Sequence, residues 1–259
     1  MVFIHETGVR FPLGLQNILI GSVLIDFLFL RINYIMIKQL FVGIFFFIIL
    51  NFIAMFLYPG GTINDSTTEG YLFFYNFFSN LGDWTALNGM DNFYSALSFN
   101  LSMLILVLSY TLFYMSYYKF FLDEKRSKIF IRISFVFVMV SMICFVLIAI
   151  FSSENATFQL HVFFVKIAFR SLMLYSIFQS LAVVYNSKSS NKMIFSNLFF
   201  TIILFFFIFI MEFGPNPFKD NESLFIQVIS QKIIVFSILI YFYTQVREVL
   251  KIPSNLSND

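Results

Sequence analysis

The sequence predicts an all-α fold, a polytopic bundle of six transmembrane helices. Of its 259 residues, 59% are hydrophobic and only 12% are charged. A soluble domain needs far more polar residues to cover its surface. The apolar runs are also continuous, whereas the strands of a membrane barrel alternate between apolar and polar residues. Short polar joints separate the runs, which favours one compact bundle over separate domains.

Six apolar runs are long enough to cross a bilayer. A helix needs roughly 20 apolar residues to span about 30 Å of hydrocarbon. The predicted spans are Leu40–Tyr58, Phe93–Tyr118, Ile129–Phe151, Leu160–Tyr185, Met193–Met211 and Leu224–Val246.

The positive charges predict how these spans are oriented. Lysine and arginine collect in the loops that stay in the cytoplasm. If the chain starts inside, the outer segments hold only Lys219, so we expect a C-terminus in the cytoplasm and a location in a bacterial cytoplasmic membrane. The inner segments hold Arg10, Arg31, Lys38, Lys119, Lys125, Arg126, Lys128, Arg132, Lys188, Lys192, Arg247 and Lys251.

The first 39 residues are expected to lie outside the six-helix core. Phe11–Leu30 is apolar, but Asp26 would cost about 2.5–3.5 kcal/mol at the centre of a span. We therefore expect an interfacial segment or an extra N-terminal helix over residues 1–39, and the sequence leaves open whether residues 1–35 form a seventh span. The six-helix domain would cover residues 40–246, and residues 247–259 would form a cytoplasmic tail.

Pro59–Asn92 is the one loop long enough to fold. Within it, the segment Tyr71–Trp84 carries apolar residues on one helical stripe and polar residues, among them Asn76, Asn80 and Asp83, on another. This pattern predicts an amphipathic helix along the outer membrane surface, anchored by Trp84. Two interpretations stay open: a plain connector, or a segment folded inward whose polar groups meet buried cations.

Three cations lie inside the predicted spans. Lys166 and Arg170, one helical turn apart, would lie about 9 Å and 15 Å deep at a rise of 1.5 Å per residue, and Lys232 would lie near the midplane. We expect no carboxylate at their depth, since Glu212 is at the outer edge of its span. Each cation must then meet water, a carbonyl, an acid from a loop or an anionic ligand.

These cations predict a pocket that opens to the outside. Most intramembrane polar groups lie in the outer halves of the spans, and the inner halves are more uniformly apolar and aromatic. The alternative is a structural role, in which Lys166 extends towards water and the other two bind carbonyls and glutamines. The candidate ligand-binding residues are Lys166, Arg170, Gln227, Gln231, Lys232, His161, Asn76, Asn80 and Asp83.

The second span carries a stripe of small residues. Ser95, Ser98, Ser102 and Ser109 recur along it. Small side chains let two membrane helices approach closely, so the stripe predicts a helix-packing face.

The sequence carries no recognisable catalytic or metal-binding constellation. The two histidines, His5 and His161, are far apart, and neither has a partner at metal-ligand spacing. We expect no catalytic residue, metal or cofactor and no nucleic-acid partner. The pattern favours a protein that is not an enzyme, although it does not decide whether a reaction is catalysed.

Several short motifs resemble a known family. Asn76–Gly82, Asn92-Phe-Tyr-Ser95, His161-Val-Phe-Phe and Gln231-Lys232-Ile-Ile resemble segments of uncharacterised six-helix bacterial membrane proteins, domain-of-unknown-function family nine-nine-eight, which is distantly similar to the Frag/DRAM/Sfk proteins. The resemblance covers about residues 40–246. It implies the fold and a cluster of polar positions, but no reaction. Asn80 stands where the family motif has aspartate, which argues against an acid role there.

Membrane lipids are the expected partners. The cations would bind an anionic lipid or lipid-phosphate headgroup, with Arg170 making a forked contact. Two alternatives stay open. A structural or assembly subunit would pair the cations with acidic groups of a partner membrane protein, and a lipid-modifying enzyme would use His161 or Asp83 for turnover.

Overall fold

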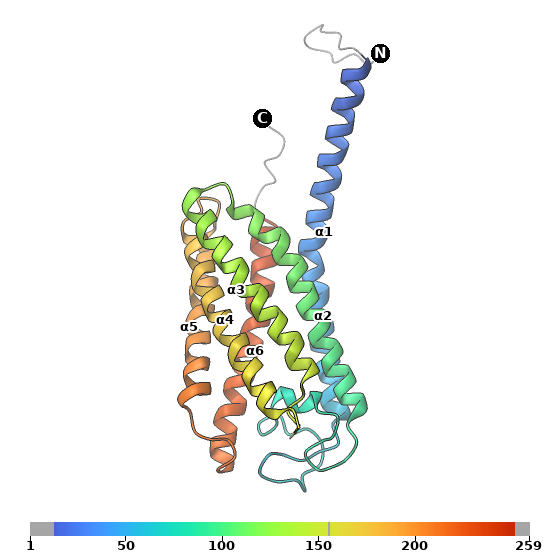
Figure 1. Cartoon of the computed structure of the whole chain (residues 1–259), viewed down its shortest axis with the longest axis vertical. Helices are drawn as coiled ribbons and strands as arrows, with labels where there is room; N and C mark the ends of the chain where they lie inside the picture. Colours follow the sequence, from blue (N-terminus) through green and yellow to red (C-terminus); the bar gives the residue numbers. More distant parts are fainter. Residues whose placement is uncertain (1–12, 155, 252–259) are drawn as a thin grey trace.

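Six long helices make up the computed structural model, which describes residues 13–154 and 156–251, with side chains from Arg31 onward (Figure 1). Within this described part, each of the six is long and apolar enough to cross a membrane, so the predicted all-α bundle is confirmed. The helices are α1 (Leu13–Leu57), α2 (Phe93–Tyr117), α3 (Lys125–Ile150), α4 (Phe158–Val184), α5 (Asn191–Phe213) and α6 (Asn221–Val249).

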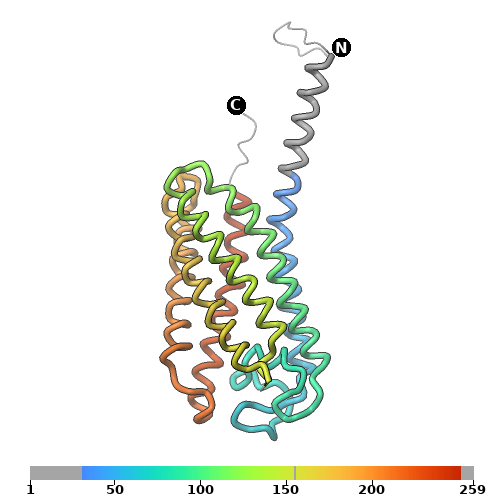
Figure 2. The backbone as a smooth tube through the Cα atoms, in the orientation of Figure 1, coloured from blue at the N-terminus to red at the C-terminus, as the bar shows by residue number. Residues whose placement is uncertain are grey.

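The helices form a closed ring. Each packs against its neighbours in sequence, and α6 returns to pack against α1 (Figure 2). Large aromatic side chains fill the interior: Tyr110 stacks on Phe242 with ring centroids 3.7 Å apart, and Phe200 stacks on Tyr241 at 4.2 Å. We call the end that carries residues 59–92 the loop end; the α3–α4 and α5–α6 connections also lie there (Figure 1).

Small residues bring α1 and α2 together, as the serine stripe predicts. Ser95 Oγ donates a hydrogen bond to the Ala54 carbonyl at 2.9 Å, and Asn51 Nδ2 donates to Ser102 Oγ at 2.8 Å. Gly43 lies against the side chain of Ser109, where a Cβ atom would collide. Ser98 instead bonds to the carbonyl of Tyr94 in its own helix.

The expected boundary between residues 39 and 40 falls inside α1. Gln39 Nε2 donates to the Ser109 carbonyl at 2.8 Å, and Ser116 Oγ donates to Asn33 Oδ1 at 3.2 Å. Residues 33–39 therefore pack against α2 as part of the same helix. Residues 1–12 and 252–259 lie outside the described residues. They comprise the start of the expected N-terminal segment and most of the expected tail.

Residues 59–92 fold over the loop end, and we call this segment the cap. Gly60 and Gly61 follow α1 with φ of 141° and 88°, a region that glycine enters without strain. Isolated antiparallel bridges join Gly60 to Glu69 and Thr85 to Asp91. Cap residues, including Phe78 and Leu81, pack against Ala54, Tyr58 and Phe99 in a small apolar cluster of their own.

The predicted amphipathic helix over Tyr71–Trp84 is wrong. The segment contains turns and one short 3₁₀ helix, η1 (Phe78–Gly82). Asn76 Oδ1 accepts from the Leu72 backbone N–H at 2.9 Å, and Asn80 Oδ1 accepts from the Phe77 N–H at 2.8 Å. Such local side-chain bonds replace the backbone bonds that an α-helix requires.

Candidate functional site

Lys232 of α6 lies buried beneath the cap, with 2% of its surface exposed. Its Nζ donates hydrogen bonds to Tyr71 Oη and, at 2.9 Å, to the Asn76 backbone carbonyl. It also lies over three rings, the nearest being Phe78 with its centroid 3.8 Å away. The cap therefore folds inward over a buried cation, but Lys232 meets the Tyr71 hydroxyl and a backbone carbonyl and not the polar side chains of the predicted stripe.

The neighbouring polar residues hold the cap in place. Gln231 Oε1 accepts from the Phe78 backbone N–H at 2.8 Å, which joins α6 to η1. Asn76 Nδ2 donates to the Gly61 carbonyl at 2.7 Å, across the cap. The side-chain amides of Gln231 and Asn76 therefore both bond to the backbone of the cap, and these bonds orient the segment that covers Lys232.

Asp83 and His161 form hydrogen bonds where the cap meets the α3–α4 connection. The Asp83 carboxylate accepts from the Ser153 backbone N–H and hydroxyl, both at 2.7 Å to Oδ1. Burial is the main reason that the pKa of Asp83 is raised to about 6, and the Ser153 bonds oppose the rise. His161 Nδ1 pairs with the Phe151 carbonyl at 2.8 Å, and Asn80 Nδ2 lies 3.5 Å from Asp83 Oδ2.

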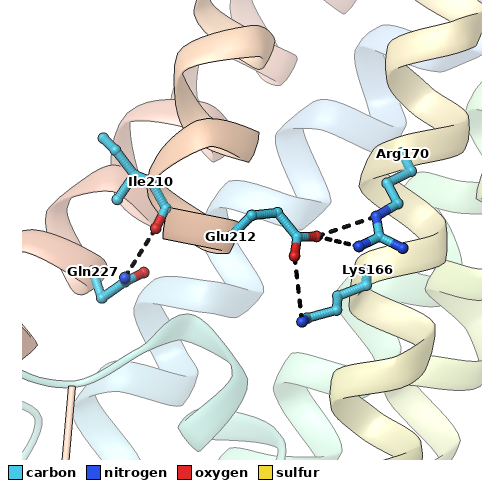
Figure 3. A network of polar contacts seen from close by, with 5 residues as sticks. All are labelled: Lys166, Arg170, Ile210, Glu212 and Gln227. Atoms are coloured by element: carbon cyan, nitrogen blue, oxygen red, sulfur yellow. Dashed lines mark hydrogen bonds and ion pairs between the residues drawn. The ribbon is translucent and has the colours of Figure 1, made fainter. Parts of the chain in front are cut away.

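Lys166 and Arg170 lie elsewhere, on the side of α4 that faces α5 (Figure 3). Arg170 Nε and a terminal nitrogen both donate to Glu212 Oε1, at 3.1 and 2.6 Å. Lys166 Nζ donates to Glu212 Oε2 at 3.4 Å. Glu212 lies at the edge of its span, as expected, but the long arginine and lysine side chains reach it in the last turn of α5, so this pair has a carboxylate partner after all.

This α4–α5 cluster carries a surplus positive charge and is accessible. Two cations share one carboxylate, so the formal net charge is +1. The side chains of Arg170 and Lys166 are 58% and 40% exposed, and that of Glu212 is 18% exposed. A further negatively charged group can therefore approach both cations from the surface of the bundle.

Gln227 bonds to the backbone at the end of α5 and contacts neither Lys232 nor the pair Lys166 and Arg170. Its Nε2 donates to the carbonyls of Ile210 and Pro215, at 3.1 and 3.0 Å. Figure 3 shows it on the other side of α5 from Lys166 and Arg170. The nine predicted site residues are therefore divided among the cap, the α4–α5 cluster and this helix end, and they share no common set of contacts.

An apolar cavity of about 60 Å³ lies inside the ring, between α1, α2, α3 and α6. Hydrophobic side chains form its wall, among them Met103, Met142, Val235 and Leu239. Met103 and Val235 also pack against the apolar cluster of the cap. The cap therefore lies next to one end of the cavity.

The half of the bundle away from the loop end is aromatic, as expected, but it is less apolar than expected because it contains a buried polar network. Tyr175 Oη bonds to Tyr110 Oη and, at 3.1 Å, to Tyr241 Oη. Gln245 Nε2 donates to Tyr241 at 2.7 Å, and Tyr241 donates to Asn197 Oδ1 at 2.6 Å. A second set is joined in the same way: Tyr114, Tyr117, Ser134 and Gln179.

A sequence signal for this network exists. Tyr110, Tyr114 and Tyr117 recur at i, i+4 and i+7 on one face of α2, and all are fully buried. Buried tyrosine hydroxyls need partners, so a tyrosine stripe together with intramembrane glutamines predicts hydrogen bonds between helices.

Comparisons of the chain with protein-family profiles, curated proteins and solved structures find no match. The resemblance of its short motifs to the uncharacterised six-helix family stays a prediction. The functional argument therefore rests on the geometry of the chain itself.

Proposed function

We propose that this protein is a multi-pass protein of a bacterial cytoplasmic membrane that binds the headgroup of an anionic lipid at Lys166 and Arg170. The observation that carries the proposal is the surplus charge of the α4–α5 cluster together with its exposure. The proposal places the loop end outside, because lysine and arginine concentrate in the segments at the opposite end.

The depth of the cluster fits a headgroup. Counting from Phe158 at the loop end of α4, Lys166 and Arg170 lie about 12 and 18 Å along the helix. Glu212 lies in the last turn of α5 at the loop end, and both cations extend to it. Long cationic side chains that extend from the hydrocarbon towards the interface meet lipid phosphates there.

Arg170 supplies the geometry for phosphate. Its guanidinium directs Nε and one terminal nitrogen to a single Glu212 oxygen, which leaves the remaining N–H groups free of that carboxylate. Guanidinium forks bind phosphate and carboxylate oxygens in pairs, and charge-assisted bonds of this kind are about twice as strong as neutral ones.

The test is the lipid retained by protein purified in a mild non-ionic detergent, measured by native mass spectrometry. The wild type is expected to retain anionic phospholipid, and Arg170→Gln combined with Lys166→Gln to lose it. Glu212→Gln is expected to retain more, because it removes the competing carboxylate. Lys188→Gln is the matched control, since Lys188 is an ion-paired, exposed lysine at the opposite end of the bundle.

Two outcomes would overturn the proposal. One is loss of lipid in Glu212→Gln equal to the loss in the double variant, which would make the cluster a structural ion pair. The other is a copurifying membrane protein that the double variant loses while the wild type holds no anionic lipid; the chain would then be an assembly subunit. His161 and Asp83 both hold loop contacts, so no contact described above favours a lipid-modifying enzyme.

A further inference from the structure

The environment of Lys232 leaves its charge without a counter-ion. Among the described residues, no carboxylate lies within ion-pair distance of its Nζ. Two neutral oxygens and three ring faces are its partners in the closed cap. A buried cation compensated only by neutral groups gains free energy from any anion that can reach it.

Residues on the side of α6 that carries Lys232 also line the apolar cavity. Val235, Leu239 and Phe242 follow Lys232 at i+3, i+7 and i+10, a spacing that keeps them on one side of the helix, and all three line the cavity. Since Val235 also packs against the cap cluster, the cation lies next to the end of the cavity nearest the cap. A positive group beside an apolar wall is complementary to a negative head on an apolar chain.

We propose that the space beneath the cap is a second, gated binding site for a single-chain anionic amphiphile, with its head on Lys232 and its chain in the cavity. The site does not depend on the α4–α5 cluster, because the two share no residue. On binding, the negative head accepts the hydrogen bonds that Lys232 Nζ donates to Tyr71 Oη and the Asn76 carbonyl in the closed cap. A charged acceptor binds an ammonium more strongly than these neutral oxygens do.

The cap is the gate. Its contacts include one to α6, from the Phe78 backbone N–H to Gln231, and two to the α3–α4 connection: Asp83 to Ser153, and the Thr85 backbone N–H to Glu154 at 2.7 Å. In this closed form the cavity has a volume of about 60 Å³, well below the roughly 300–1,000 Å³ of typical ligand pockets. A chain therefore requires the wall to move, and Met103 and Met142 are side chains that adapt readily.

The probe is a diazirine-bearing medium-chain fatty carboxylate, added to the full-length protein in non-ionic detergent and irradiated. Peptide mass spectrometry is expected to find labels on the cavity segments of α2, α3 and α6. The methyl ester of the same probe, which has no negative charge, is expected to label them about tenfold less, the factor expected for one charge-assisted hydrogen bond. Lys232→Gln is expected to produce the same loss with the carboxylate.

A cavity-filling variant keeps the test independent of the cap. Leu239→Trp occupies the wall of the cavity and is expected to abolish labelling there, while Ile240→Trp, on the neighbouring position that is 66% exposed, is expected to leave it unchanged. Arg170→Gln is likewise expected to leave it unchanged, which separates this site from the surface site.

Three results would overturn the gated site. They are labels confined to exposed outward positions, equal labelling by acid and ester, and equal labelling of Leu239→Trp and wild type. Any of them would make Lys232 a structural anchor of the cap and the cavity a packing defect.

Discussion

Ser153 donates two hydrogen bonds to the carboxylate of Asp83, 70 positions away in the chain. This contact joins the cap to the α3–α4 connection. It also places an acid in a buried position, where desolvation raises its pKa from the ordinary value of 3.8 to about 6.

The raised pKa predicts how stability depends on pH. Because the folded pKa exceeds the ordinary value, the cost of burying the ionised carboxylate is fully present above pH 6 and is relieved as the pH falls towards 3.8. The contribution of Asp83 should therefore raise the free energy of unfolding across this window, by about 3 kcal/mol at most. Asp83→Asn should remove that contribution.

Thermal unfolding in detergent, followed by the fluorescence of Trp84 in the cap, measures this effect. Asp91→Asn is the control, since Asp91 is an exposed carboxylate of the same loop. Parallel pH profiles for Asp83→Asn and the wild type would contradict the assignment.

Lys232→Met should loosen the cap while the bundle stays folded. The variant loses the bonds to Tyr71 and to the Asn76 carbonyl, and hydrogen bonds to a charged group contribute about 1.5–3 kcal/mol. Amide hydrogen exchange over residues 71–80 should become faster by the corresponding factor. Ile233→Met, at a position that faces outward, should exchange as the wild type does; slow exchange in both variants would show that the cap does not depend on Lys232.

Tyr241→Phe should destabilise the bundle by about 1–3 kcal/mol, because it leaves buried polar groups without their partner. The hydroxyl donates to Asn197 Oδ1 and accepts from Gln245 Nε2. Tyr243→Phe removes the same hydroxyl from a position that is 45% exposed and should cost little. Chemical denaturation of the two variants compares them directly, and equal midpoints would mean that the network contributes no stability.

Gly43→Ala should weaken the contact between α1 and α2. A Cβ at position 43 would overlap the Cβ and Oγ atoms of Ser109, and overpacking of this kind typically costs about 1–3 kcal/mol. Ser109→Gly in the same chain removes both colliding atoms and should restore most of the lost thermal stability. A double variant as unstable as the single one would show that another contact is responsible.

Hydropathy alone predicted the fold and the six spans to within a few residues at most of their ends. Whether a run of about twenty residues dissolves in lipid depends on its own composition, and long-range contacts change that little. The serine stripe of α2 was predictable in the same way, because small residues along one helix face indicate where another helix packs closely. The cap was not: its asparagines suggested a helix by their spacing, but Asn76 and Asn80 bond to the local backbone instead.

The sequence by itself determined which runs are apolar enough to cross a membrane and which side chains within those runs are unusual for such a setting. Only the tertiary structure decided their partners: Glu212 of α5 for Lys166 and Arg170, the cap for Lys232, and a tyrosine network for Gln179 and Gln245. The physical reason is that a hydrogen bond or ion pair depends on distances of about 3 Å between residues that are dozens of positions apart. Helix periodicity gives the face on which a side chain lies, but not the neighbour that it meets.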